Sequence, residues 1–213
     1  MTTTMLLLLA DGRYPGGGHA HSCGLEPAVA DGSVADLPSF ESFLTGRLLT
    51  TGLVDAWLAA AACAGADPRA LDAEADARCA SPALRQASRR LGRGLRRAAA
   101  VRWPSLSGAG AEHQAVVQGL VARAAGLEPE EAAHLPVASL LAGAASAACR
   151  LLPIDAAEAV AVTTRLAPLA DGVAGTAAAS ARLSLDQGPV AGTPLLERRA
   201  EEHAAWEVRL FAS

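Results

Sequence analysis

The sequence contains no lysine, because all 18 basic residues among its 213 are arginines. This absence excludes mechanisms that need a lysine nucleophile, a Schiff base or the phosphate-binding lysine of a P-loop. Aromatic residues are also scarce, at 3%, while alanine supplies much of the 51% hydrophobic share. Since alanine has the highest helix propensity and strand-forming residues are sparse, the composition favours helices packed through small side chains.

The familiar signatures of enzymes and cofactor sites are missing too. We find no G-x-S-x-G, H-E-x-x-H, G-x-G-x-x-G, Walker or C-x-x-C pattern. The sequence therefore predicts a protein that is not an enzyme and holds no resident cofactor. The four cysteines lie far apart, which is typical of a reducing compartment rather than of a disulfide framework.

Targeting signals and membrane spans are equally absent from the sequence pattern. The opening MTTTMLLLLAD has no basic region before its short apolar run, so it does not resemble a signal peptide. The longest uncharged run, from Leu135 to Cys149, is shorter than the roughly 20 residues that a span needs. We therefore predict a cytoplasmic protein that does not contact a membrane.

The periodicity and the punctuating residues predict an all-α fold, an irregular single-domain helical bundle covering 1–213. Asp67-Pro68 and Ser81-Pro82 are typical helix starts, with a capping side chain before a proline. Small residues at 138, 142 and 145 predict a helix that another backbone approaches closely. Flexible loops are expected near 11–20, 104–111 and 184–194, and helices at 22–31, 37–51, 53–64, 82–103, 112–125, 129–152, 155–167, 173–183 and 195–211.

Charge is unevenly distributed along the chain. The net charge is −4, yet residues 77–111 contain eight arginines and no acid. Arg85, Arg89 and Arg93 recur every four residues and so share one face of the predicted helix. This face is either solvated beside acidic neighbours or a partner-binding surface. Nucleic acid is disfavoured as a partner, because the protein is acidic overall and only one nearby aromatic residue could stack on bases.

Two further clusters are candidates for function. His19, His21 and Cys23 alternate after a glycine-rich loop and could hold a transition metal, or they could simply pack the loop against the next helix. Near the other end, His203, Trp206 and Leu210 share one face of the predicted final helix. We expect that face to dock either on the protein's own core or in the groove of a partner.

An ordered series of motifs runs through the whole chain. The start, LLLLADGRYPGGGHAHSCGLEPAV, carries Asp11, Pro15, Gly17, His21, Ser22, Gly24, Leu25 and Glu26. Next come an Arg-x-x-Ser-x-x-x-Gly-Arg segment at 85–93, a His-x-x-Val-x-x-Gly segment at 113–119 and a small-residue segment that ends in Arg150 and Leu-Leu-Pro. The series closes on His203 and Arg-Leu-Phe-Ala-Ser. In this order the motifs resemble the UreF family of urease accessory proteins.

The resemblance has two departures and several implications. Asp155-Ala156 stands where the family usually has Gly-Gln, and His19 stands where an aromatic residue is common. The resemblance implies an all-α homodimer without a catalytic centre, which binds the accessory protein UreD (also called UreH). Together the two proteins recruit the GTPase UreG and deliver nickel to apo-urease. The alternative is a metallochaperone that carries nickel transiently on His19, His21 and Cys23.

The resemblance also assigns residues to these contacts. It implies that the C-terminal segment, with His203, Arg209, Phe211 and Ser213, docks on UreD. It implies that Arg150 faces the GTPase. With the residues derived from periodicity, the predicted partner-binding set is Arg85, Arg89, Arg93, Arg150, His203, Trp206, Arg209, Leu210, Phe211 and Ser213.

Overall fold

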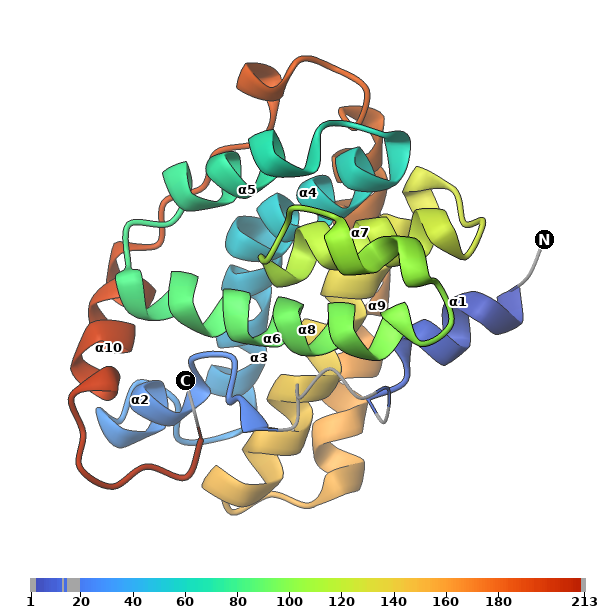
Figure 1. Cartoon of the computed structure of the whole chain (residues 1–213). Helices are drawn as coiled ribbons and strands as arrows, with labels where there is room; N and C mark the ends of the chain where they lie inside the picture. The colour runs from blue at the N-terminus through green and yellow to red at the C-terminus, as the bar shows by residue number, and fades with distance from the viewer. Residues whose placement is uncertain (1–2, 13, 15–19, 212–213) are drawn as a thin grey trace.

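The computed structural model describes residues 3–12, 14 and 20–211, and among them it contains helices and no strand. The predicted all-α fold is confirmed (Figure 1). The α-helices are α1 (Thr3–Ala10), α2 (Leu25–Ala30), α3 (Leu37–Arg47), α4 (Leu53–Ala64), α5 (Pro68–Ala77), α6 (Pro82–Ala100), α7 (Gln114–Ala124), α8 (Pro129–Leu151), α9 (Ala156–Ala179) and α10 (Pro194–Ala204). A π-helical segment, η2 (Leu48–Gly52), joins α3 to α4, and short 3₁₀ segments are η3 (Pro104–Gly108) and η4 (Leu185–Gln187).

The helix starts follow from local capping. Asp67 accepts a hydrogen bond from the Ala70 backbone N–H, and Ser81 accepts one from that of Leu84. In both helices proline occupies the first position, where its missing N–H costs nothing. The two predicted starts are therefore confirmed.

Several predicted helix boundaries were wrong. α3, η2 and α4 form one continuous helical run where we expected a break at residue 52, and α9 continues through Pro168 where we expected two helices, 155–167 and 173–183. An interior proline costs about 3 kcal/mol. Leu166, Ala170 and Val173 nevertheless bury one face of α9 on both sides of that proline, and this packing holds the helix together.

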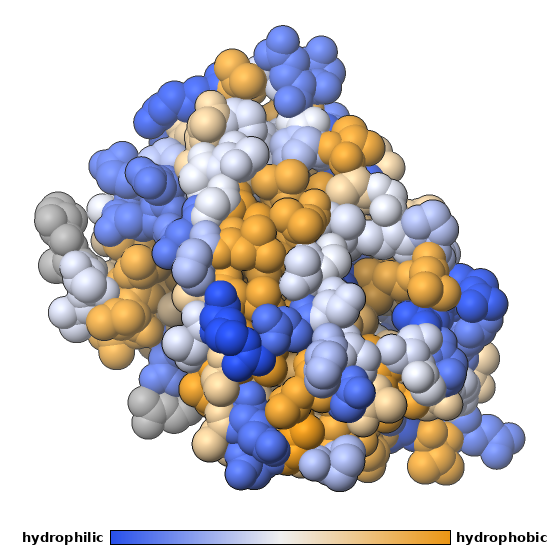
Figure 2. Space-filling model, turned by 180° about the vertical axis from the view of Figure 1, so that it is seen from behind, coloured by the Kyte–Doolittle hydropathy of each residue, from blue (hydrophilic) through white to orange (hydrophobic). Residues whose placement is uncertain are grey.

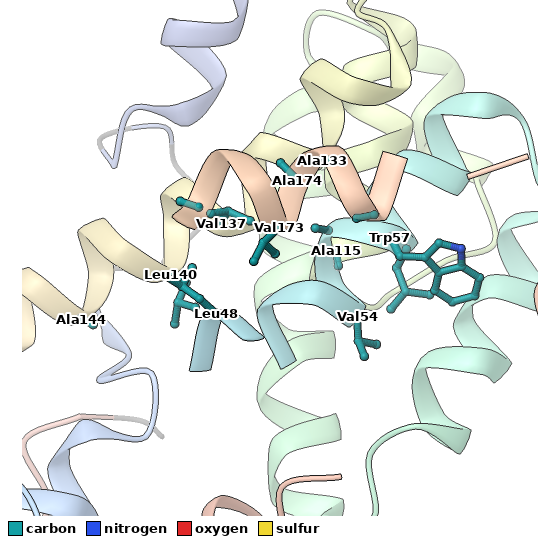
Figure 3. Close-up of a cluster of buried hydrophobic side chains, with 14 of the residues drawn as sticks. Leu48, Val54, Trp57, Ala115, Ala133, Val137, Leu140, Ala144, Val173 and Ala174 are labelled. Atoms are coloured by element: carbon teal, nitrogen blue, oxygen red, sulfur yellow. The ribbon is translucent and has the colours of Figure 1, made fainter. Parts of the chain in front are cut away.

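α4 lies at the centre of the bundle, packed by α7, α8 and α9. Figure 3 shows the core where these helices meet, to which α4 contributes Trp57 and Val54, α8 contributes Val137 and α9 contributes Val173. Gly119 of α7 allows the closest approach, since a Cβ there would lie 2.1 Å from the carbonyl oxygen of Ala59. The small side chains predicted from composition thus serve to bring helix backbones together.

The small-residue row of α8 has a different role from the predicted one. Its buried face carries Val137, Leu140 and Ala144, whereas Ala142 is exposed. The predicted row instead lines a shallow groove beside α9, bounded by Ala138, Ala142, Ala145 and Val160. A row of small residues permits a close neighbour but does not by itself say whether the neighbour belongs to the same chain.

Two helical runs, Leu37–Ala64 and Pro129–Leu151, are long and apolar enough to cross a membrane by length and composition alone. In this fold they are core helices, and 61% and 50% of their most apolar windows are buried inside the protein. Their hydrophobicity is therefore accounted for by the core. The uncharged run from Leu135 to Cys149 is one part of the second.

Candidate functional site

The segment that follows α10 meets α2 at one buried carboxylate. Glu26 of α2 accepts a hydrogen bond from His203 Nε2 at 2.8 Å. Its two oxygens also accept the backbone N–H groups of Leu210 at 2.7 Å and of Phe211 at 3.1 Å. We call Glu26, His203, Leu210 and Phe211 the terminal clasp. In Figure 1 the chain beyond α10 turns back and ends beside α2.

The clasp explains why the final helix is shorter than predicted. We expected a helix over 195–211, but α10 ends at Ala204. In a longer helix the N–H groups of Leu210 and Phe211 would bond to carbonyls one turn earlier. Here Glu26 takes both N–H groups, and a hydrogen bond to a charged acceptor is the stronger one. His203 and Trp206 still touch, edge to face, with ring centroids 4.8 Å apart.

The clasp buries one part of the tail and exposes the rest. Phe211 is 4% exposed, and the guanidinium of Arg150 lies 4.4 Å from the centre of its ring. Val208, by contrast, is 86% exposed and Leu210 is 60% exposed. Arg209 is exposed between them, and Ser213 lies outside the described residues. The tail therefore offers a small apolar surface on an anchored backbone.

The predicted arginine stripe is bound within the protein. Arg85 donates to the carbonyl of Cys79 at 2.7 Å and also faces Asp76, as does Arg89. Arg93 pairs with Glu112 at 2.8 Å across the loop before α7. Acidic neighbours from other elements therefore meet the stripe, as one of our two interpretations expected. Whether it also contacts a partner stays a prediction.

The Arg-x-x-Ser-x-x-x-Gly-Arg and His-x-x-Val-x-x-Gly motifs contact each other where α6 meets the start of α7. We call this contact the α6–α7 joint. Ser88 of α6 hydrogen-bonds His113 Nδ1 at 3.1 Å, and His113 Nε2 reaches Asp76 at 3.0 Å. Burial acts to raise the pKa of Asp76, but the bonds from His113 and Arg89 outweigh it and hold that pKa below its ordinary value. Gly92 completes the joint, since a Cβ there would lie 1.8 Å from the carbonyl oxygen of Glu112.

The serine, histidine and aspartate of this joint take part in capping a helix. Ser88 Oγ also accepts the backbone N–H of Gln114 at 3.1 Å, so it serves the first turn of α7. Asp72 accepts the two preceding N–H groups, those of Glu112 and His113. The network caps a helix that lacks a capping side chain of its own.

Of the predicted metal candidates, His19 lies outside the described residues. His21 is buried and has partners of its own. Burial raises the pKa of the Cys23 thiol, against the opposing effect of Arg47. A protonated thiol is a poor metal ligand. Within the described ranges no three histidine, cysteine or acidic side chains gather closely enough to hold a metal ion.

Our sequence reasoning missed a polar group inside the bundle. Arg47, Thr51 and Asp55 lie on the continuous α3–η2–α4 run and line a partly open cavity of about 460 Å³. Burial raises the pKa of Asp55 to about 6, although Arg47 opposes the shift. The signal was present in the sequence, because Asp55 is the one charged residue of the otherwise apolar segment 53–64.

Comparison with known proteins identifies the family. The family model described as UreF matches residues 34–167, which is more than half of the chain. The chain belongs to the UreF family. Among its relatives are proteins named urease accessory protein UreF from Mycolicibacterium vanbaalenii, 46% identical over 98% of this chain and 97% of the relative, and from Mycobacterium sp. (strain JLS), 43% identical over 100% and 99%. The relative from Mycobacterium tuberculosis is 42% identical over 98% of both chains.

Membership confirms the resemblance seen in the motifs. The UreF relatives are named as accessory proteins, so our prediction that the chain is not an enzyme is also confirmed. In this UreF fold the opening and closing motifs meet in the terminal clasp, and the Arg-Ser-Gly-Arg and His-Val-Gly motifs meet at the α6–α7 joint. The motifs therefore mark the places where distant parts of the chain are fastened together.

Proposed function

We propose that this protein is an assembly factor in urease maturation. In this proposal it binds UreD (UreH) in the cytoplasm, and the two form a platform that recruits the GTPase UreG and passes nickel to apo-urease. The observation that supports the proposal best is membership of the UreF family along nearly the whole chain. Nickel is the cargo of this process, not a resident cofactor of the chain.

We assign to UreD the exposed surface that the terminal clasp anchors. Its residues, Val208, Arg209 and Leu210, combine apolar area with one arginine, a composition that suits protein interfaces. Glu26 holds the backbone beneath them, so binding costs little conformational entropy. Trp206 and the buried His203 support this surface from the end of α10.

Arg150 links this surface to the one that we assign to the GTPase. Its guanidinium lies over the ring of Phe211, and the rest of the residue is exposed at the end of α8. A partner that pulls on the tail therefore changes the surroundings of Arg150. We propose that docking of UreD and recruitment of UreG are coupled through this contact.

A homodimer is part of the same proposal. Seen from the side opposite α6 and α7, the surface carries a broad apolar area at its centre (Figure 2). The groove between α8 and α9, lined by Ala138, Ala142, Ala145 and Val160, adds a shallow apolar surface. Apolar surface of this kind is typical of faces that become buried on association.

The test is a pull-down with a matched pair of variants. Val208→Asp should reduce capture of UreD, and with it the UreD-dependent capture of UreG in the presence of GTP. Val101→Asp is the control, since Val101 is 87% exposed and Val208 86% exposed, and Val101 lies at the far end of α6. Equal capture by both variants would show that the exposed surface at 208–210 is not part of the interface. If the unmodified chain together with UreD captured no UreG, the proposed platform would be contradicted.

Transient nickel binding through His19, His21 and Cys23 is tested separately. Calorimetry with Ni²⁺ on the isolated chain should show no micromolar site if the chain only assembles its partners. A micromolar site that disappears in the His19→Ala, His21→Ala double variant would favour the metallochaperone instead.

A further inference from the structure

The cavity beside Arg47 and Asp55 is partly open, and its walls come from parts of the chain that lie far apart in sequence. Its walls come from the segment after α1, from the α3–η2–α4 run, and from α6, α7 and α8. Its volume of about 460 Å³ falls within the range of small-molecule sites, roughly 300–1,000 Å³. Much of the wall is apolar and includes Val54, Leu58, Leu84, Leu91, Leu95 and Leu140.

One helical run places three polar side chains in a row on this wall. Arg47, Thr51 and Asp55 follow one another at intervals of four residues. In a regular α-helix, eight residues would leave Arg47 and Asp55 about 80° apart around the axis. The π-helical segment Leu48–Gly52 widens the turn between them and brings both to the cavity. Such π segments are rare and often occur at functional sites.

Two of these side chains carry a buried polar atom that has no partner among the described residues. Arg47 Nε and Thr51 Oγ1 are buried and make no hydrogen bond. Asp55 forms no ion pair with Arg47 within the 4.0 Å that defines one. A buried polar group without a partner is costly, so each usually has one. Two such atoms beside the half-buried carboxylate of Asp55, all on one cavity wall, point to a molecule that supplies the missing partners.

The other charged groups around the cavity are already engaged. Arg78 donates to the carbonyl of Pro189, Arg85 to that of Cys79, and His113 contacts Asp76 and Ser88. Asp11 and His21 have partners of their own. Arg47 and Asp55 are therefore the cation and the anion that remain for a ligand within the described part of the wall.

We propose that this cavity binds a small zwitterion, with its carboxylate on Arg47, its ammonium group on Asp55 and Thr51 hydrogen-bonding between them. A simple anion would satisfy Arg47 but would face Asp55, and a simple cation would face Arg47. A molecule with both charges satisfies both ends. The apolar wall favours a short aliphatic chain between the two charges. This site is independent of the partner-binding function proposed above.

The probe is γ-aminobutyrate, compared with butyrate and butylammonium, which each keep one of its charges. Binding to the full-length purified chain is measured by calorimetry and by ligand-observed NMR. We expect saturable binding of γ-aminobutyrate and at least about tenfold weaker binding of each single-charge compound. Equal binding of all three compounds, or no saturable binding of γ-aminobutyrate, would overturn the proposal and leave the cavity to solvent.

Two variants locate the site, and a third is the control. Thr51→Val keeps the shape of the side chain and should weaken binding of γ-aminobutyrate about tenfold. Asp55→Asn should weaken it at least as much while strengthening binding of butyrate, because the repelling carboxylate is gone. The control, Arg165→Met, removes an exposed arginine that pairs with Glu41 and should change neither. Unchanged affinities in both Thr51→Val and Asp55→Asn would contradict the proposal.

Discussion

Glu26 is a buried carboxylate and Asp55 a half-buried one that lines a cavity, and their hydrogen-bond partners differ completely. Glu26 accepts three hydrogen bonds, one from an imidazole and two from backbone N–H groups. Asp55 accepts none within the described structure, and burial raises its pKa to about 6. Loss of contact with water is therefore compensated by hydrogen bonds at Glu26 and is not compensated at Asp55. Whether a carboxylate removed from water stabilises a protein depends on the hydrogen-bond donors around it and not on its burial alone.

The largest effect expected from this comparison is that of removing Glu26. Glu26→Ala leaves His203 and two backbone N–H groups buried without an acceptor, which should cost about 4 kcal/mol of unfolding free energy. Urea unfolding followed by circular dichroism measures it. Glu202→Ala, an exposed acid on α10, is the matched control and should cost well under 1 kcal/mol. Similar losses in the two variants would mean that the clasp does not hold the tail.

The second prediction concerns Asp55 and pH. An acid with a higher pKa in the folded than in the unfolded state binds more protons when folded, so its ionisation weakens folding as pH rises. With the pKa raised from 3.8 to about 6, the wild type should lose up to about 3 kcal/mol relative to Asp55→Asn between about pH 4 and pH 7.5.

The measurement is urea unfolding of both proteins at the two pH values. The informative quantity is how the difference in unfolding free energy between the two proteins changes with pH, because the other groups titrate equally in both. A difference that stays constant with pH would show that Asp55 has an ordinary pKa in the folded protein. The comparison with Glu26 would then lose its basis.

The smallest effect separates the two contacts that hold the tail. Arg150→Met removes the cation above the Phe211 ring but keeps an apolar side chain of similar length. We expect a loss of about 0.5–1 kcal/mol in urea unfolding, well below that of Glu26→Ala. A loss equal to that of Glu26→Ala would show that the contact of Arg150 with the Phe211 ring anchors the tail as strongly as the Glu26 carboxylate does.

Features fixed by a few neighbouring residues could be predicted from the sequence. The starts of α5 and α6 are examples, because Asp67 and Ser81 cap the helix that follows them. The end of α10 could not be predicted, since it depends on a carboxylate 177 residues away from His203. The continuity of α9 through Pro168 likewise depends on packing against other helices.

In the candidate sites, too, the individual residues could be predicted from the sequence but the contacts between distant residues could not. The motif residues were found individually, because their types and spacings stand out. Their pairing, such as Ser88 with His113 or Glu26 with Phe211, is a property of the folded chain. Arg47 and Asp55 were missed, since only the π-helical turn brings them to one cavity.

The position of the clasp matters for how the protein is made. Synthesis proceeds from the N-terminus, so Glu26 emerges well before the residues that it binds. Until Leu210 and Phe211 are available, the carboxylate of Glu26 in a growing chain lacks the two backbone N–H groups that donate to it. Closing of the clasp therefore awaits synthesis of this segment, and a ribosome that stalls before it yields a bundle that is still open at α2.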